Sequence, residues 1–382
     1  MLALIAPWAA AVALLLGFEV VEEIGSPHSA RHPFARPQVT HGRSGPWGYL
    51  QYTRIAIEPP EYFVVLPSQP QMPRWFFKGF NRQQLTTFLQ TLPLTEIQRV
   101  SLTQAATWIE SKEGIWLAPP PELVLGLNQQ ARTRIYDVLA LIPENQMQTK
   151  VFSFNPDYLD ERLKASNLRP ESVKLFRDLL YWQGRRLLFA DADVVLPKLA
   201  NDIERRRFLK MLARKNTLLV KLLITPETDV KELVEYWAVG GRSKDLEPLL
   251  HSLRRVHGGT ELGIAQLLPA FARQRLYTYP DPSANPNLLR KNDLWAVLNF
   301  FRWTPDDRYA DMTVAGEVVK KEYYEIAGNT RLGDMAALFS SDNLMVSSMV
   351  YIADDIVFGK AGPLPTEPWV LVTLSDWMRL WS

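Results

Sequence analysis

The sequence KNDLWAVLNFF, residues 291–301, decides the fold of the C-terminal part of this 382-residue chain. Between positions 294 and 301 apolar side chains recur with a spacing that predicts an amphipathic helix. Asp293 stands where an N-cap carboxylate would accept the first backbone N–H groups of that helix. We therefore expect a helix that starts at Asp293 and buries one face.

Three shorter motifs follow and predict turns and strands. RLGDMAALF, residues 331–339, contains a Gly-Asp turn and then a short strand. MVSSMVYIADDIVF, residues 345–358, gives two β-rich runs on either side of Asp354-Asp355, and PWVLVTLSDW closes the segment. Residues 287–382 are therefore expected to form a helix packed on a small antiparallel sheet.

The order of these motifs resembles the NlpC-type cell-wall cysteine peptidases, which have a minimal papain-like fold. In that family a helix opens with Asp-Cys-Ser-Gly, a Gly-Asp turn leads into a strand, and a later strand carries His-Val-Gly-Ile-Tyr-x-Gly-Asp. In this sequence Asn292-Asp293 fall on the Asp-Cys pair, Leu332-Gly333-Asp334 on the turn, and residues 347–354 on the histidine strand. The resemblance covers the last quarter of the chain.

This resemblance implies a papain-like module that has lost its catalytic groups. It puts Asp293 at the nucleophile position and Ser347 at the base position. The chain contains no cysteine, so a thiolate mechanism is excluded. The groove of the family would remain, with Asp293, Trp295, Ser347, Tyr351 and Lys360 as the candidate lining residues. Asp293 is either a remnant of that site or simply a helix cap.

Two other classes of function stay open. A hydrolase would use Asp293 with Asp334 or Asp354 in metal-assisted or acid–base chemistry, although Asp354 and Asp355 are also typical turn residues. A purely structural envelope scaffold would instead make its contacts through the middle of the chain. All five histidines precede Tyr279, so none lies near Ser347 in sequence.

The composition limits the partners and cofactors. A hydrophobic content of 47% and a charged content of 22% are typical of a globular protein. A net charge of +2 gives no electrostatic basis for binding nucleic acid. The absence of cysteine excludes disulfides, iron–sulfur clusters and cysteine-ligated zinc. We expect no cofactor and no metal site, because His28, His32 and His41 have no carboxylate among them.

Residues 1–18 carry no charged side chain. As a helix they would reach about 27 Å, close to the hydrocarbon thickness of about 30 Å. We expect one apolar helix over residues 1–16 that serves as a membrane anchor or as a signal segment. The alternative is a buried helix of a soluble domain.

These observations predict an α+β protein with four parts. They are an N-terminal apolar segment at 1–18, a Ser-, Pro- and Gly-rich linker at 19–46, a mixed, mostly helical region at 47–278 and the papain-like module at 287–382. We expect a non-catalytic protein, anchored in or exported to a bacterial cell envelope. It would bind a peptide or protein partner through its degenerate groove and contact the membrane through the N-terminal segment.

Overall fold

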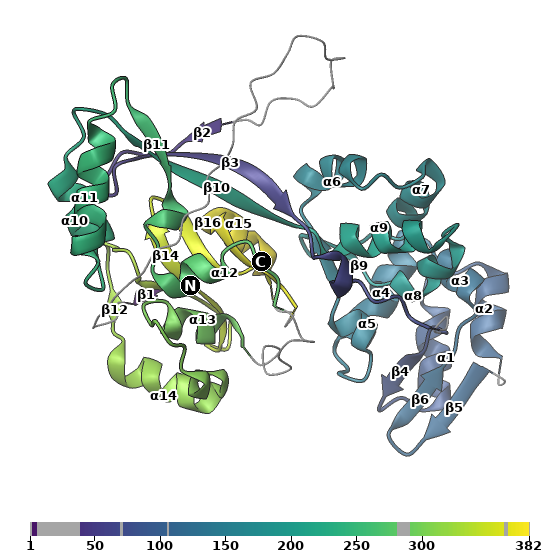
Figure 1. Cartoon of the computed structure of the whole chain (residues 1–382). Helices are drawn as coiled ribbons and strands as arrows, with labels where there is room; N and C mark the ends of the chain where they lie inside the picture. Colours follow the sequence, from purple (N-terminus) through teal and green to yellow (C-terminus); the bar gives the residue numbers. More distant parts are fainter. Residues whose placement is uncertain are drawn as a thin grey trace, which may run out of the picture. The chain divides into compact units, whose positions relative to one another are not determined.

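The computed structural model describes residues 2–5, 39–68, 72–104, 107–280, 291–362 and 366–381. The chain divides into two compact units, one comprising Met1–Ile57 with Lys215–Met378 and the other Glu58–Arg214 with Arg379–Ser382. Both units combine helices with small antiparallel sheets (Figure 1), which confirms the mixed α and β class predicted from the sequence.

The unit that contains Glu58–Arg214 holds two three-stranded sheets, ordered β4-β6-β5 and β7-β9-β8. Its strands are β4 (Trp75–Lys78), β5 (Trp108–Ser111), β6 (Gly114–Leu117), β7 (Phe152–Phe154), β8 (Tyr181–Gln183) and β9 (Arg186–Phe189). Its α-helices are α1 (Arg82–Gln90), α2 (Glu96–Thr103), α3 (Pro121–Leu125), α4 (Gln129–Ala140), α5 (Gln146–Thr149), α6 (Leu159–Ala165), α7 (Pro170–Asp178), α8 (Ala192–Val195) and α9 (Asp202–Ala213).

A buried ion pair lies in the core of this unit. The guanidinium of Arg132, which is fully buried, donates to the carboxylate of Asp191 and to the carbonyl oxygen of Val124. Tyr136 also donates to Asp191, so the buried carboxylate has two side-chain donors. Pairing of this kind offsets part of the cost of removing both charges from water.

The other unit contains the stretch that led the sequence analysis. Its two sheets have the strand orders β11-β10-β3-β2 and β12-β1-β13-β14-β15-β16. The strands are β1 (Leu2–Ile5), β2 (Val39–His41), β3 (Tyr49–Ile57), β10 (Lys215–Ile224), β11 (Thr260–Gly263), β12 (Glu325–Ile326), β13 (Met335–Phe339), β14 (Met345–Ala353), β15 (Ile356–Lys360) and β16 (Trp369–Thr373). The helices are α10 (Val230–Trp237), α11 (Ser243–Arg254), α12 (Ala270–Arg275), α13 (Asp293–Asn299), α14 (Met312–Glu322) and residues 374–378 of α15 (Leu374–Trp381).

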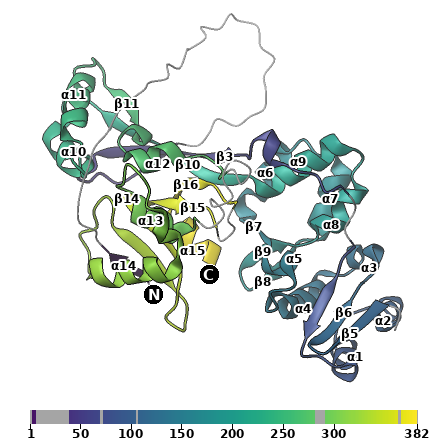
Figure 2. The ribbon, with the colours of Figure 1, turned by 60° about the horizontal axis from the view of Figure 1, so that its bottom comes forward.

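Helix α13 packs on β14 and β15 of the six-stranded sheet (Figures 1 and 2). Its buried apolar residues share one core with Val350, Ile352 and Phe358 of these two strands. The ring of Phe300, just after the helix, lies 5.8 Å from that of Phe358. The structure thus confirms the helix on an antiparallel sheet that the motifs from residue 291 onward predicted, including the break between the two β-rich runs at Asp354-Asp355.

The two sheets of this unit are joined by the hydroxyl of Thr217. This buried side chain of β10 accepts a hydrogen bond from the backbone N–H of Leu371 at 3.0 Å and donates to its carbonyl oxygen at 2.9 Å. Leu371 belongs to the edge strand β16, whose backbone groups need partners away from water. One hydroxyl therefore takes the place of a neighbouring strand at this point.

The prediction of one apolar helix over residues 1–16 is wrong for the part that the structure describes. Leu2–Ile5 forms strand β1, which pairs antiparallel with β12 on one side and with β13 on the other. An apolar run without a polar face suits a strand paired on both sides as well as a helix, because neither exposes backbone groups. Residues 6–16 lie outside the described residues.

The segment at 19–46, expected to be a linker, contains a short strand. Val39–His41 forms β2, and Gly45 makes an isolated bridge with Gly48. Within the described ranges, no helix has both the length and the apolar character needed to cross a bilayer. The function of residues 1–18 as a membrane anchor or signal segment stays a prediction.

We expect Thr217→Val to lower the free energy of unfolding by about 1–3 kcal/mol, because valine has the shape of threonine but leaves two buried backbone groups of Leu371 without partners. The measurement is urea unfolding of the purified variant. Thr53→Val on β3 is the matched control, since no hydrogen bond of the Thr53 hydroxyl is found among the described residues. Equal losses for the two variants would contradict the role assigned to Thr217.

Candidate functional site

The start of helix α13 brings together the two positions that the resemblance assigned to the catalytic pair. The hydroxyl of Ser347 donates to Oδ2 of Asp293 at 2.8 Å, and the backbone N–H of Ser348 donates to the same oxygen at 2.8 Å. These residues are more than 50 positions apart in the chain. Asp293 therefore ties the first turn of the helix to strand β14.

Asp293 is not the N-cap of this helix, contrary to the interpretation from sequence. Asn292 has an extended backbone and its side chain accepts from the N–H of Trp295, which makes it the cap. Asn and Asp have almost the same preference for the N-cap position, so residue type alone does not decide which of Asn292 and Asp293 caps the helix. Because Asn292 is the cap, the carboxylate of Asp293 is available to β14.

The hydroxyl of Ser347 has both a donor and an acceptor. It donates to Asp293, and the indole Nε1 of Trp377 donates to it at 3.2 Å. Ser347 is only 5% exposed. A serine nucleophile needs a base that removes its proton, and a carboxylate without an intervening imidazole is a weak base for that purpose. The hydrogen bonds of the Ser347 hydroxyl link strand β14 to helix α13 and helix α15.

Lys360 lies near this pair at the end of β15 and is buried. Its ammonium stands 5.4 Å from the centre of the Trp369 ring. Burial lowers the pKa of Lys360 to about 8, while the negative charges of Glu367 and Asp293 act in the opposite direction. Glu367 also pairs with Lys215 at 2.9 Å, so the region contains opposite charges in nearly dry surroundings.

The other two expected groove residues lie apart from Asp293. The fully buried ring of Trp295 packs against Phe271 with 5.2 Å between ring centres, so it belongs to the core. Tyr351 is four residues further along β14 than Ser347, about 13 Å at the usual rise per residue. Its hydroxyl donates to the carbonyl oxygen of Asp354 at 2.9 Å.

The carboxylates named for the alternative hydrolase are also separated. The backbone of Asp334 accepts from the N–H of Tyr351, which places it beside the far part of β14. Asp354 lies in the turn after β14 and binds the side chain of Arg43 at 2.6 Å. Among the described residues, no group of three or more His, Asp or Glu side chains is arranged to hold a metal ion.

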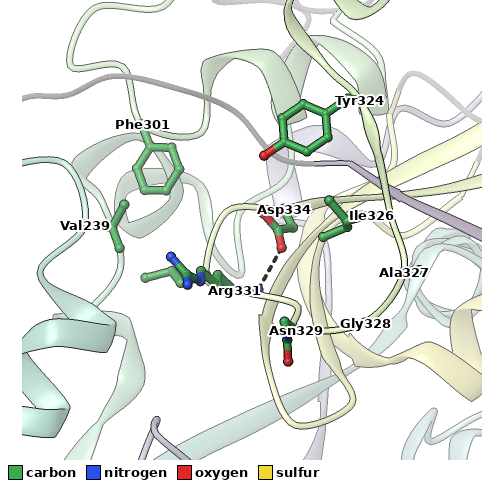
Figure 3. A pocket seen from close by; sticks show the side chains of 10 residues that line it. Val239, Phe301, Tyr324, Ile326, Ala327, Gly328, Asn329, Arg331 and Asp334 are labelled. Atoms are coloured by element: carbon green, nitrogen blue, oxygen red, sulfur yellow. Dashed lines mark hydrogen bonds between the residues drawn. The ribbon is translucent and has the colours of Figure 1, made fainter.

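A pocket of about 560 Å³ opens beside Asp334 (Figure 3). Three segments line it: the chain just after α10, the chain just after α13, and the stretch between α14 and β13. The lining residues are Val239, Phe301, Tyr324, Ile326, Ala327, Gly328, Asn329, Arg331, Leu332 and Asp334. Cavities of this size are typical of sites for small molecules or for parts of peptides.

The turn from Arg331 to Asp334 forms one wall of the pocket. The backbone N–H of Arg331 donates to Oδ2 of Asp334 at 2.7 Å, drawn as the dashed line in Figure 3, and the N–H of Asp334 returns a bond to the Arg331 carbonyl. Gly333 has a φ of +99°, and a Cβ there would lie 2.2 Å from the ring of Phe301. The turn therefore needs glycine both for its backbone and for its contact with Phe301.

Asp334 is buried although it lines the pocket. Burial raises the pKa of its carboxyl group, whereas the N–H bond from Arg331 and the Arg331 charge act to lower that pKa. The guanidinium of Arg331 is exposed and makes no ion pair with a carboxylate among the described residues. The pocket thus holds two opposite charges that are not paired with each other.

The sequence analysis identified the Gly-Asp turn but missed the pocket. Val239, Phe301 and Tyr324 come from three separate segments, and only the folded chain brings them to the turn. The dipeptide Gly328-Asn329 is a local sequence signal of a turn, and both residues have a positive φ and are exposed.

Comparison of the chain with models of protein families, with curated proteins and with solved structures gave no match.

We expect Asp293→Ala to cost about 1–3 kcal/mol of stability, because it leaves the buried donors of Ser347 and Ser348 without their acceptor. Asp293→Asn keeps one side-chain oxygen and should cost less. Asp293→Ser separates the two interpretations, since serine is a good cap but is too short to reach β14. Urea unfolding should find Asp293→Ser close to Asp293→Ala. Stability close to wild type for Asp293→Ser would support capping instead.

The lowered pKa of Lys360 predicts a rise in stability with pH. Below about pH 8 the Lys360 side chain is charged in the folded and in the unfolded chain. Between pH 8 and about 10 it is charged only in the unfolded chain, which therefore binds more protons than the folded one. The free energy of unfolding should therefore rise across this window by up to about 3 kcal/mol relative to Lys360→Met. Urea unfolding at several pH values measures this difference. If the free energies of unfolding of wild type and Lys360→Met change in parallel with pH, the pKa of Lys360 is not lowered by folding.

Proposed function

We propose that the part of the chain from residue 291 onward is a degenerate papain-like module that binds a peptide segment without cleaving it. The order of elements supports this proposal: helix α13 packs on the antiparallel strands β14 and β15, and its first turn meets the strand position of the family's histidine. The wider resemblance to the NlpC-type peptidases remains part of the proposal.

The observation that carries the proposal is the difference between the two ends of β14. At one end the buried Ser347 hydroxyl uses its one proton on Asp293 and accepts from Trp377, so it has no donor left for a substrate. At the other end a pocket of about 560 Å³ has apolar walls and a few polar groups. Such a lining is typical of ligand-binding pockets.

A hydrolase that uses Asp293 with Asp334 or Asp354 has less support. Acid–base catalysis by two carboxylates needs both within reach of one bond. Asp293 contacts β14 at Ser347, and Asp334 lies beside Tyr351 about 13 Å along the strand. Asp354 is engaged by Arg43.

The cellular location is a further part of the proposal. The uncharged residues 1–18 favour attachment to, or export across, a bacterial membrane. A partner peptide would then come from the cell envelope. Fractionation of cells that express the whole chain tests this point, and a protein found only in the cytosol would rule it out.

The binding proposal predicts that filling the pocket weakens peptide binding. Val239→Arg puts a long side chain at the pocket wall, and Val256→Arg puts the same side chain at a site of similar exposure, since the two valines are 39% and 41% exposed. We expect Val239→Arg to weaken binding of a short-peptide library at least about tenfold, equivalent to about 1.4 kcal/mol. Val256→Arg should bind like wild type.

Equilibrium binding of the labelled library and mass spectrometry of the recovered peptides give the two readouts. The peptides should be recovered intact with and without divalent metal ions. Equal binding by both variants would place the ligand elsewhere. Cleavage that Asp293→Asn abolishes while the fold stays intact would favour the hydrolase.

A further inference from the structure

We infer that the pocket beside Asp334 selects a zwitterionic ligand, namely a short apolar peptide with both termini free, whose carboxylate binds Arg331 and whose amino group binds Asp334. This inference rests on the proposed binding function and specifies its ligand. It follows from two opposite charges that share one cavity without pairing.

Arg331 provides the site for the carboxylate. Its guanidinium lines the cavity and is exposed, and no carboxylate among the described residues pairs with it. Its two hydrogen bonds with Asp334 in the described structure use the backbone N–H and carbonyl of Arg331, which leaves the side chain available. A guanidinium binds a carboxylate through two parallel N–H···O bonds, which gives both affinity and orientation.

Asp334 provides the site for the amino group. Its Oδ2 accepts the Arg331 amide, and no donor to Oδ1 is found in the described parts of the chain. The carboxylate is buried at the wall of the pocket, and its raised pKa reflects the cost of holding the charge there. An ammonium group that enters the pocket would supply the opposite charge that this buried carboxylate needs, and this ion pair would favour binding of the ligand.

The rest of the lining suits an apolar side chain. Phe301 and Val239 lie on one side of the charged pair and Ile326 on the other (Figure 3). Tyr324 adds an aromatic ring and a hydroxyl above the pair. A volume of about 560 Å³ accommodates a ligand of dipeptide size.

The test titrates four related dipeptides into the whole protein by calorimetry: Leu-Leu, its N-acetyl form, its C-terminal amide and the doubly capped form. Wild type should bind free Leu-Leu at least about tenfold more tightly than either singly capped form, which corresponds to about 1.4 kcal/mol per lost charge contact. Arg331→Gln should bind the acid and the amide equally but still prefer the free amine. Asp334→Asn should show the opposite pattern.

Two matched variants control for net charge. Lys321→Gln removes an exposed cation from α14, and Asp342→Asn removes an exposed carboxylate from the turn before β14; neither should change the preference. Asp334→Asn keeps an oxygen for the Arg331 amide, and thermal unfolding verifies that it folds.

Equal affinity of wild type for all four dipeptides would overturn the inference and leave the proposed peptide binding intact. Binding of longer peptides without binding of any of the four would do the same. Failure of every peptide, including the library that tests the Val239 variant, would overturn both.

Discussion

The carboxylate of Asp293 is the contact on which the arrangement of the C-terminal elements depends. It accepts the Ser347 hydroxyl and the Ser348 amide, and so fixes the first turn of α13 against β14. Among the described residues the pairing of β14 with β15 begins at Val350, so Ser348 lies beyond the paired part of the strand on that side. The Asp293 side chain thus supplies an acceptor to the backbone of β14 close to the residue where its pairing with β15 begins. This accounts for an acidic residue, partly buried, at the start of an apolar helix.

The same strand relates the closed pair to the open pocket. Ser347 contacts α13 near one end of β14, and Tyr351 further along donates its N–H to Asp334 and accepts from Gly333. The pocket wall is therefore anchored to the strand that Asp293 orients. Gly333 then sets how closely the turn approaches Phe301, because any side chain there would overlap the ring. A change at Asp293 should reach the pocket through the position of β14.

The sequence predicted the elements of this region much better than their contacts. The spacing after Asp293 and the paired β-rich runs predicted α13, β14 and β15, because their apolar patterns match the periods of a helix and of strands. The cap was assigned one residue too late, since Asn292 and Asp293 are both good caps. Leu2–Ile5 was assigned to a helix because an apolar run without polar residues has no period.

The contacts depend on residues far apart in the chain, for which a single sequence contains no local signal. From the sequence, only the resemblance to a known family linked Asp293 with Ser347, and nothing linked Trp377 with either of them. The pocket combines Val239, Phe301 and the turn at 331–334, which no periodic pattern connects. Trp295 was expected in a groove although its helical spacing equally suits the core where it lies.

The central claim is that ligand binds at the Arg331–Asp334 turn and not at the Asp293–Ser347 pair. Backbone amide shifts of the whole protein, recorded by NMR during titration with a free-ended apolar peptide, test it most directly. The account predicts large, saturable shifts at Gly328, Asn329 and Gly333, with Ser347 and Ser348 almost unchanged. Shifts concentrated at Ser347 and Ser348, with the pocket residues unaffected, would contradict it.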